Sequence, residues 1–370
     1  MKILVVGSGI AGAVVAWECA EAGHQVTVFE KSGHVGGNCR DYNNEYGEKI
    51  HAEGPHLFHT SADSIAVKWL SQFTEWTHYE HRVRALLEDG RTTPLPVNQT
   101  TLEDVFGVKF LTPDDARKFL DDLREKDIVA PTNSDQVFLK SVGATLADIF
   151  FRPYTLKHWG RPATEIEAKV GARIPTRTDR DDRYFTDAFQ KMPTDGFTPI
   201  FEKIFSHPNI DLVLNKSHNC RENVSFDKIF LSCPIDEYYD YEFGRLPYRS
   251  VKFVEGVVDE DQSATTINFT DDGIYTRSTQ WSLIPTSGRR KDGKSTVTLE
   301  VPCDPAENEG KCYYPVRNEE SLNLYSKYAE LAEKDDLTFI GRLGQFIYYD
   351  MAPCINATHI IVKRFLDGIH

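Results

Sequence analysis

The sequence predicts a mixed α/β fold, in which a Rossmann-like nucleotide-binding domain is interrupted by an inserted helical bundle and an antiparallel β-sheet domain. A strand–helix–strand pattern with three glycines opens the chain, helical periodicity follows Thr101, and short β-branched stretches dominate residues 247–302. A chain of 370 residues also exceeds what one hydrophobic core usually covers, so we expect more than one lobe.

The opening 37 residues have the pattern of a βαβ unit. Residues 2–6 form a short apolar strand, 11–22 a helix and 25–30 a second strand. Between the first two lies Gly7-Ser-Gly9-Ile-Ala-Gly12. The first glycine permits a tight turn, the second lets the backbone approach a pyrophosphate, and the third lets helix and strand pack closely. The pattern predicts a dinucleotide site at Gly9 to Gly12.

Further features support a cofactor at this place. Glu30 ends the second strand, where an acid can accept a hydrogen bond from an adenosine ribose. Gly36 and Gly37, before Asn38, let the backbone pass close to a bulky ligand, or else form a flexible loop. Near the other chain end, Gly341-Arg342-Leu343-Gly344 follows the predicted strand 337–340 and could reach the same pyrophosphate. The stretch 229–231 is another short strand, and Ser232-Cys-Pro234 after it is either an edge-strand ending or a cofactor contact.

The middle of the chain predicts the two insertions. Residues 82–97 form a hairpin that turns at Asp89-Gly90. Thr112 as N-cap and Pro113 at the first helical position begin a helix, and further helices fill 134–168. Residues 265–269 and 295–301 form antiparallel strands, and 321–334 returns to helix. The expected domains are 1–75 with 190–245 and 330–370 for the nucleotide, 98–168 for the helices, and 76–97 with 169–189 and 246–329 for the sheet.

Composition excludes several classes of function. The formal charge of −14 makes the surface a poor partner for nucleic acid or anionic lipid. No run of about 18 apolar residues predicts a membrane span. The cysteine count is odd and contains no Cys-x-x-Cys pair, which favours free thiols in a reducing cytoplasm over a metal knuckle or a disulfide framework; the seven are Cys19, Cys39, Cys220, Cys233, Cys303, Cys312 and Cys354.

Motifs spread over nearly the whole chain resemble bacterial UDP-galactopyranose mutases. Together they are specific, although no single one would be: Gly7-Ser-Gly-Ile-Ala-Gly12, Gly36-Gly-Asn38, His56-Leu-Phe-His59, Tyr154-Thr-Leu-Lys-His-Trp-Gly160, Arg173-Ile-Pro175, Pro234-Ile-Asp236, Tyr248-Arg-Ser250, Ile267-Asn-Phe-Thr270, Tyr275-Thr-Arg277, Tyr313-Tyr-Pro-Val316, Gly341-Arg-Leu343 and Tyr348-Tyr-Asp-Met351. The resemblance implies an FAD-binding domain, a helical bundle and an antiparallel sheet.

The resemblance also implies a reaction. Members of this family interconvert the pyranose and furanose forms of a nucleoside-diphosphate sugar with no net redox change. Reduced FAD attacks the anomeric carbon through flavin N5, the diphosphate leaves, and the sugar ring opens and recloses before the diphosphate returns. An external reductant such as NAD(P)H is then needed to reduce the flavin. A reductase that passes hydride from NAD(P)H to a flavin often has two nucleotide folds, whereas this chain has one GxGxxG motif. A homodimer is left open, since no segment shows an interface pattern.

By resemblance, three groups of residues carry this chemistry. The catalytic group is Arg173, Arg277, His59 and Asp350. The FAD-binding group is Gly7, Gly9, Ile10, Ala11, Gly12, Glu30, Lys31, Gly37, Asn38, His56, Gly341, Arg342 and Met351. The substrate-binding group is Phe150, Phe151, Tyr154, Thr155, Trp159, Asn268, Tyr313 and Tyr348. The two arginines would hold the leaving diphosphate, because guanidinium forks match phosphate oxygens.

Each assignment has a plainer alternative. The arginines could lie at the surface, and the tyrosines, Phe150 and Phe151 could fill a core. His56 could be structural, and a metal at His56 and His59 is not expected, because no carboxylate or cysteine cluster completes a site. A flavin-dependent oxidase of amines or related small molecules is the alternative enzyme. A scaffold that only senses a nucleotide is the alternative outside enzymes.

The sequence departs from the family after Arg277. A Glu-His-containing run is usual there, whereas this chain has Ser278-Thr-Gln-Trp281. A pocket that bonds a sugar hydroxyl rejects analogues lacking it, so the lost polar partners predict a deoxy, amino or longer-chain sugar in place of galactose. The basic tract 284–294 is either a solvated hairpin loop or part of the same change.

Overall fold

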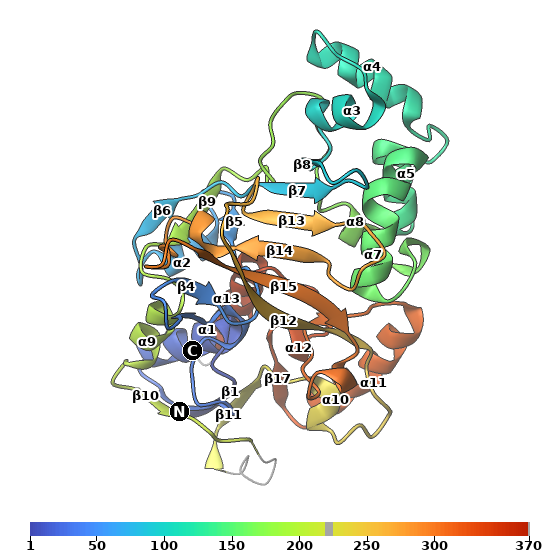
Figure 1. Cartoon of the computed structure of the whole chain (residues 1–370). Coiled ribbons are helices and arrows are strands. Elements are labelled where there is room, and N and C mark those ends of the chain that lie inside the picture. Colours follow the sequence, from blue (N-terminus) through green and yellow to red (C-terminus); the bar gives the residue numbers. More distant parts are fainter. Residues whose placement is uncertain (219–224, 369–370) are drawn as a thin grey trace.

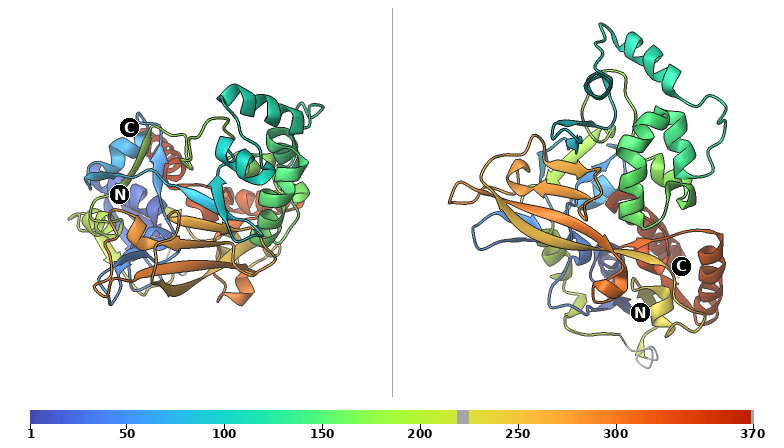
Figure 2. Two further views of the ribbon diagram at one scale, coloured as in Figure 1. Left: turned by 45° about the horizontal axis from the view of Figure 1, so that its top comes forward. Right: turned by 45° about the vertical axis from the view of Figure 1, so that its right-hand side comes forward.

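The computed structural model describes residues 1–218 and 225–368, which form a nucleotide-binding lobe, a large sheet and a helical region. In Figure 1 the nucleotide-binding lobe lies at the bottom, the large sheet crosses the middle, and helices α3 (Gln99–Phe106) and α4 (Pro113–Leu123) extend at the top. Figure 2 shows from two other directions that these helices lie at the far end of the sheet from the nucleotide-binding lobe. Cys220 lies outside the described residues, and the other six cysteines are free thiols.

The nucleotide-binding lobe is built on a parallel sheet of five strands. The strands lie in the order β10 (Ile210–Val213), β2 (Gln25–Phe29), β1 (Lys2–Val6), β11 (Lys228–Leu231) and β17 (Leu337–Phe339). The helices of this lobe are α1 (Ile10–Glu21), α2 (Ile65–Leu70), α9 (Thr198–Phe205), α10 (Ile235–Tyr238), α11 (Glu319–Lys334), α12 (Gly341–Gly344) and α13 (Met351–Asp367). The predicted βαβ unit is confirmed, with both chain ends contributing to one sheet.

Alternation along β1 explains why this sheet is covered on both faces. Ile3 and Val5 point into one core together with α1, α9 and α13, whereas Leu4 points into a second core with Tyr328 of α11. Successive side chains of a strand leave opposite faces, so an uninterrupted apolar strand needs helices on each side. The apolar stretch 2–6 therefore determines a layered lobe.

The large sheet has seven strands. They lie in the order β16 (Tyr314–Pro315), β12 (Tyr248–Val258), β15 (Ser295–Cys303), β14 (Arg277–Gln280), β13 (Thr266–Phe269), β7 (Val83–Leu86) and β8 (Thr92–Leu95). The predicted hairpin is confirmed, because β7 and β8 pair antiparallel across Asp89-Gly90. The sheet is not wholly antiparallel, since β13 pairs parallel with β7. A parallel pair requires a long connection, and here the whole helical region separates the two strands.

The helical region follows β8 in the chain and ends before β9. Its remaining segments are α5 (Ser134–Val142), α6 (Ala144–Leu146), the π-helical η2 (Ala147–Phe151), α7 (Arg152–Trp159), the 3-10 helix η3 (Ala163–Glu165) and α8 (Ala168–Gly171). The predicted start of α4 is confirmed: the Thr112 hydroxyl accepts from the N–H of Asp115, whose carboxylate accepts from the N–H of Thr112. This reciprocal cap satisfies two backbone donors at the helix end.

Two small sheets contribute buried residues, among them Ile50, Phe58 and Met192, to the core of the nucleotide-binding lobe. They are β3 (Asp41–Asn43) with β4 (Lys49–His51), and β5 (Phe58–Thr60) with β9 (Phe189–Pro193) and β6 (Trp76–His78). One predicted domain boundary, between residues 329 and 330, falls inside α11, whose buried Tyr328 packs in the nucleotide-binding lobe. The domain boundaries as a whole stay a prediction. In the part of the chain that the structure describes, no helix has the length and apolarity needed to cross a bilayer.

Candidate active site

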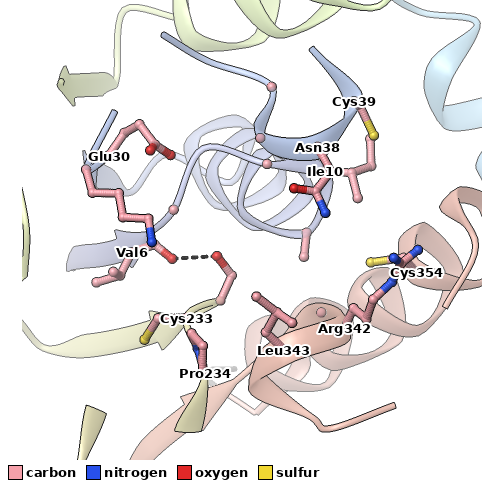
Figure 3. A pocket seen from close by; sticks show the side chains of 18 of the residues that line it. Val6, Ile10, Glu30, Asn38, Cys39, Cys233, Pro234, Arg342, Leu343 and Cys354 are labelled. Atoms are coloured by element: carbon pink, nitrogen blue, oxygen red, sulfur yellow. Dashed lines mark hydrogen bonds between the residues drawn. The ribbon is translucent and has the colours of Figure 1, made fainter. Parts of the chain in front are cut away.

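The larger of two neighbouring cavities lies at the carboxyl end of β1 and has a volume of about 860 Å³. Figure 3 shows Glu30 at one end, Arg342 and Cys354 at the other, and Ile10 and Asn38 between them. The structure brings together twelve of the thirteen residues predicted to bind FAD: Gly7, Gly9, Ile10, Ala11, Glu30, Lys31, Gly37, Asn38, His56, Gly341, Arg342 and Met351. Segments more than 300 residues apart in the chain therefore face one space.

Gly12 does not line this cavity, so its prediction as a cofactor contact is corrected. A Cβ at Gly12 would lie 1.9 Å from the carbonyl oxygen of Gly7, which means that Gly12 serves the close packing of α1 on β1. Gly7 itself has a φ of 101°, a left-handed conformation that favours glycine. A Cβ at Gly37 would lie 3.0 Å from the Cα of Gly9. The two loops can approach this closely because both residues lack a side chain.

Glu30 is tied to the loops on either side of it. Its two carboxylate oxygens accept hydrogen bonds from the backbone N–H and the hydroxyl of Ser8 and of Ser32, each at 2.8 Å. Burial alone would raise the pKa of Glu30, but the donors of Ser32 and Ser8 outweigh it and lower the pKa. The carboxylate is therefore ionised, and a ribose hydroxyl would share it with two serines.

We expect Glu30→Ala to weaken FAD binding by roughly tenfold or more, because a hydrogen bond to a charged group contributes about 1.5–3 kcal/mol. Flavin content after purification and the dissociation constant from fluorescence titration measure the change. Ser32→Ala is the matched control, since it removes the hydroxyl donor to the same carboxylate, keeps the backbone N–H donor and leaves the charge in place. Flavin affinity that is equal in Glu30→Ala and wild type would contradict the predicted ribose contact.

The smaller cavity has a volume of about 530 Å³ and lies among the sheet, the helical region and the nucleotide-binding lobe. It is lined by the four residues predicted to be catalytic, His59, Arg173, Arg277 and Asp350, and by six of the eight predicted to bind substrate, Phe151, Tyr154, Thr155, Trp159, Asn268 and Tyr348. Four residues line both cavities: His56, Arg342, Asp350 and Met351. A ligand in one cavity would therefore meet a ligand in the other at this shared wall.

The guanidinium groups of both predicted arginines line the smaller cavity, and each pairs with a carboxylate. Arg173 donates to both oxygens of Asp350, at 2.8 and 2.6 Å, and lies 4.5 Å from the ring centre of Tyr348. Arg277 donates to the hydroxyl of Tyr154 and lies 3.4 Å from the carboxylate of Glu300. Burial alone would lower the pKa of Arg277, but Glu300 and the neighbouring tyrosines, Tyr154 first among them, together raise the pKa, so the guanidinium stays charged.

The shared wall carries a cation and a neutral histidine. Arg342 donates to the backbone carbonyls of Tyr313 and Tyr349, and no carboxylate among residues 1–218 and 225–368 pairs with it. Its charge is thus open to an anionic ligand. Burial lowers the pKa of His56 to about 4, so this ring is neutral near pH 7, and its Nδ1 lies 2.9 Å from the carbonyl oxygen of Gly54.

Two predicted substrate residues do not line the cavity. Tyr313 turns its hydroxyl to the carboxylate of Glu53, and the neighbouring Tyr314 takes its place in the cavity wall. Adjacent residues in an extended segment point to opposite sides. The sequence alone therefore does not tell which of the two tyrosines faces the cavity. Phe150 is 2% exposed and fills the core of the helical region, whereas Phe151 reaches the cavity.

The departure after Arg277 also lies away from the cavity. The indole of Trp281 is fully buried and donates to Thr298, and Gln280 donates to Asp261. Ser278, Thr279, Gln280 and Trp281 are not part of the cavity lining. These four residues therefore pack in and beside the large sheet, and their positions do not support the predicted loss of polar partners for the sugar.

Several lining residues were not anticipated. They are His81, His158, Tyr184, Phe185, Asp187, Glu300 and Tyr314. In the sequence, Glu300 lies on the polar face of the alternating stretch 295–301, which favours an exposed side chain; in the structure it is 4% exposed, and burial raises its pKa. Tyr184 to Asp187 lie in an irregular segment, where no periodicity indicates which side chains face inward.

Comparison with known proteins gives a consistent result. The profile of the UDP-galactopyranose mutase family matches residues 149–348, and that of an NAD(P)-binding Rossmann-like domain matches residues 5–73. A probable UDP-galactopyranose mutase of Klebsiella pneumoniae is 32% identical over all of this chain and 95% of its own length. A dTDP-fucopyranose mutase of Escherichia coli is 34% identical over 96% of each chain.

Among solved structures, a reduced UDP-galactopyranose mutase superimposes with a TM-score of 0.74 at 18% identity, covering all of this chain and 95% of the other. At that identity the match supports the fold. Similarity to an L-amino-acid oxidase of Pseudechis australis reaches 50% identity but covers 12% of this chain and 8% of the oxidase. A match of 44 residues is too short to support the alternative of a flavin oxidase.

Proposed function

The chain belongs to the UDP-galactopyranose mutase family, and from this premise we propose that it interconverts the pyranose and furanose forms of a sugar on a pyrimidine nucleoside diphosphate, with FAD in the larger cavity. The observation that carries the proposal is the shared wall of His56, Arg342, Asp350 and Met351. It lets a flavin held by the glycine loop meet a sugar held by Arg173 and Arg277 in the smaller cavity.

The residues of the larger cavity fit FAD. The N-terminus of α1 presents backbone N–H groups beside Gly9, which suit a pyrophosphate, and Glu30 keeps an ionised carboxylate near the expected ribose. Arg342 supplies a cation at the opposite end of the space. The reduced flavin, when bound, supplies the nucleophile for the sugar carbon. The requirement for the reduced form and for an external reductant such as NAD(P)H is part of this proposal.

The smaller cavity suits a nucleoside diphosphate sugar. Tyr154, Thr155 and Trp159, on α7, offer stacking surface and a hydroxyl for the nucleoside. Arg173 and Arg277 would exchange part of their pairing with Asp350 and Glu300 for the diphosphate, and so stabilise it as it departs. We propose this exchange as the way in which a protein with a net charge of −14 holds an anion.

The sugar itself is a narrower proposal. Fucose is 6-deoxygalactose, so the names of the two relatives describe galacto-configured sugars on two pyrimidine nucleotides. Their similar identities, 32% and 34%, favour neither. We therefore propose a galacto-configured hexopyranose as the substrate, with a deoxy or otherwise modified sugar still a prediction. A cytoplasmic location and a homodimer likewise stay predictions.

A substrate panel with dithionite-reduced protein tests this function. We expect conversion of UDP-galactopyranose, dTDP-fucopyranose or both to their furanose forms, with kcat/KM at least about tenfold above that for GDP-linked or gluco-configured analogues, which corresponds to about 1.4 kcal/mol. Chromatography of the products measures it. Oxidation of an amine with release of hydrogen peroxide, in the absence of sugar rearrangement, would instead support the oxidase alternative.

A further inference from the structure

His59 is held in the smaller cavity by a carboxylate from another part of the chain. Its Nδ1 lies 2.8 Å from Oδ2 of Asp187, which belongs to the segment before β9. Both side chains line the cavity, and they are 18% and 34% exposed. A hydrogen bond of this length between a ring nitrogen and a carboxylate determines which nitrogen carries the proton, because a carboxylate only accepts.

A stacked aromatic ring also fixes the orientation of the His59 ring plane. Phe185 stacks on it, with ring centres 3.5 Å apart and planes 12° apart. The segment that carries Phe185 and Asp187 is itself anchored, because the amide of Gln190 donates to the carbonyls of both residues, at 3.4 and 2.9 Å. Arg177 donates to the Phe185 carbonyl as well, at 3.1 Å. These contacts use backbone atoms, so they do not depend on the side chain at position 187.

The other ring nitrogen of His59, Nε2, is available to accept a hydrogen bond from a ligand. In the described part of the chain, Nε2 has no hydrogen-bond partner, and it is not among the fully buried polar atoms that lack one. With the proton on Nδ1, Nε2 keeps its lone pair and is an acceptor. The other two histidines that line only this cavity, His81 and His158, are 5% and 8% exposed.

We propose that Asp187 is a positioning residue that fixes the Nδ1–H tautomer of His59, so that Nε2 accepts a hydrogen bond from a hydroxyl of the sugar in the smaller cavity. The inference rests on the proposed function for the identity of the ligand. The same arrangement of carboxylate, imidazole and hydroxyl orients histidines in many active sites, because an incorrect tautomer presents a donor where an acceptor is needed.

The decisive variant is Asp187→Leu, which removes the acceptor while the backbone anchors remain. NMR of FAD-loaded protein labelled with 15N-histidine reports the tautomer, and His59→Gln identifies the His59 signal. We expect Nδ1 protonation in the wild type and a mixture, or Nε2 protonation, in Asp187→Leu. With reduced enzyme, kcat should fall about tenfold while KM changes little, and Asp187→Glu should restore part of the rate.

A second pair of the same kind provides the control. His359 Nδ1 lies 2.7 Å from the carboxylate of Glu18, joins α13 to α1, and lines neither cavity. Glu18→Gln should leave the His59 signal and kcat unchanged, although it can lower the melting temperature.

An unchanged His59 tautomer in Asp187→Leu, or a kcat within twofold of wild type, would overturn the inference. If the wild type rearranges no sugar, the proposed function fails, and the tautomer measurement still decides the role of Asp187.

Discussion

Fully oxidised protein is expected to rearrange no nucleotide sugar above background, whereas dithionite-reduced protein should turn over many times without consuming reductant. The reason is that the reaction needs a nucleophile that attacks the sugar carbon, and few side chains of the smaller cavity could act as that nucleophile. Of its carboxylates, the type of group that attacks anomeric carbons in glycosidases, Asp187, Asp350 and Glu300 are paired with His59, Arg173 and Arg277. Neither cysteine nor lysine is among its described lining residues. A reduced flavin at the shared wall has the electron pair that the oxidised ring lacks, so the difference in rate should be on the order of a hundredfold or more.

Anaerobic assays measure both parts of this prediction. The flavin absorbance follows the redox state, and product chromatography counts turnovers per equivalent of dithionite. Re-oxidation in air should stop the reaction, and a second reduction should restart it. Turnover by oxidised protein, or one equivalent of reductant consumed per product, would show that the flavin has another role.

The alanine variants of Arg173 and Arg277 should each lose on the order of ten- to hundredfold in kcat/KM, because a charge-assisted contact contributes about 1.5–3 kcal/mol. Lysine should restore only part of the activity, since an ammonium group does not form the planar fork that matches phosphate oxygens. Removing Arg277 also leaves the buried carboxylate of Glu300 beside fewer positive charges, so this variant should lower the melting temperature as well.

Arg289→Ala is the matched control for charge. Arg289 pairs with Asp261 on the surface and lines neither cavity, so its loss should leave kcat/KM within twofold. Steady-state kinetics with reduced enzyme, together with the affinity of the product diphosphate, separates binding from rate. Activity close to wild type in either Arg173→Ala or Arg277→Ala would refute the diphosphate role of that residue.

Local patterns in the sequence predicted much of the architecture. The alternating and continuous apolar stretches predicted β1, β2, β7, β8 and β15, and the Thr112-Pro113 signal predicted the start of α4. The glycine motif predicted the loop at which the larger cavity opens. The predictions of turns and caps succeeded because the backbone conformation there depends on residues that are close together in the sequence.

Most of the residues predicted by resemblance to a family line one of the two cavities, but the resemblance did not predict the side on which each neighbouring residue lies. Tyr313 and Tyr314 are adjacent and chemically identical, and only the pairing of β16 with β12 decides that Tyr314 faces the smaller cavity. Trp281 follows a predicted diphosphate ligand, yet the fold turns it into the core. A shift of one residue in register moves a side chain to the other face, and the partner strand that sets the register is remote in sequence.

The sequence by itself therefore determined the fold class, the glycine loop and the family. Tertiary structure alone decided which residues meet: Asp187 with His59, 128 positions apart, and Glu300 with Arg277. It also decided that β13 pairs parallel with β7. Contacts of this kind depend on how separate lobes pack against each other, and the free energy of that packing comes from many weak interactions that no single stretch of sequence contains.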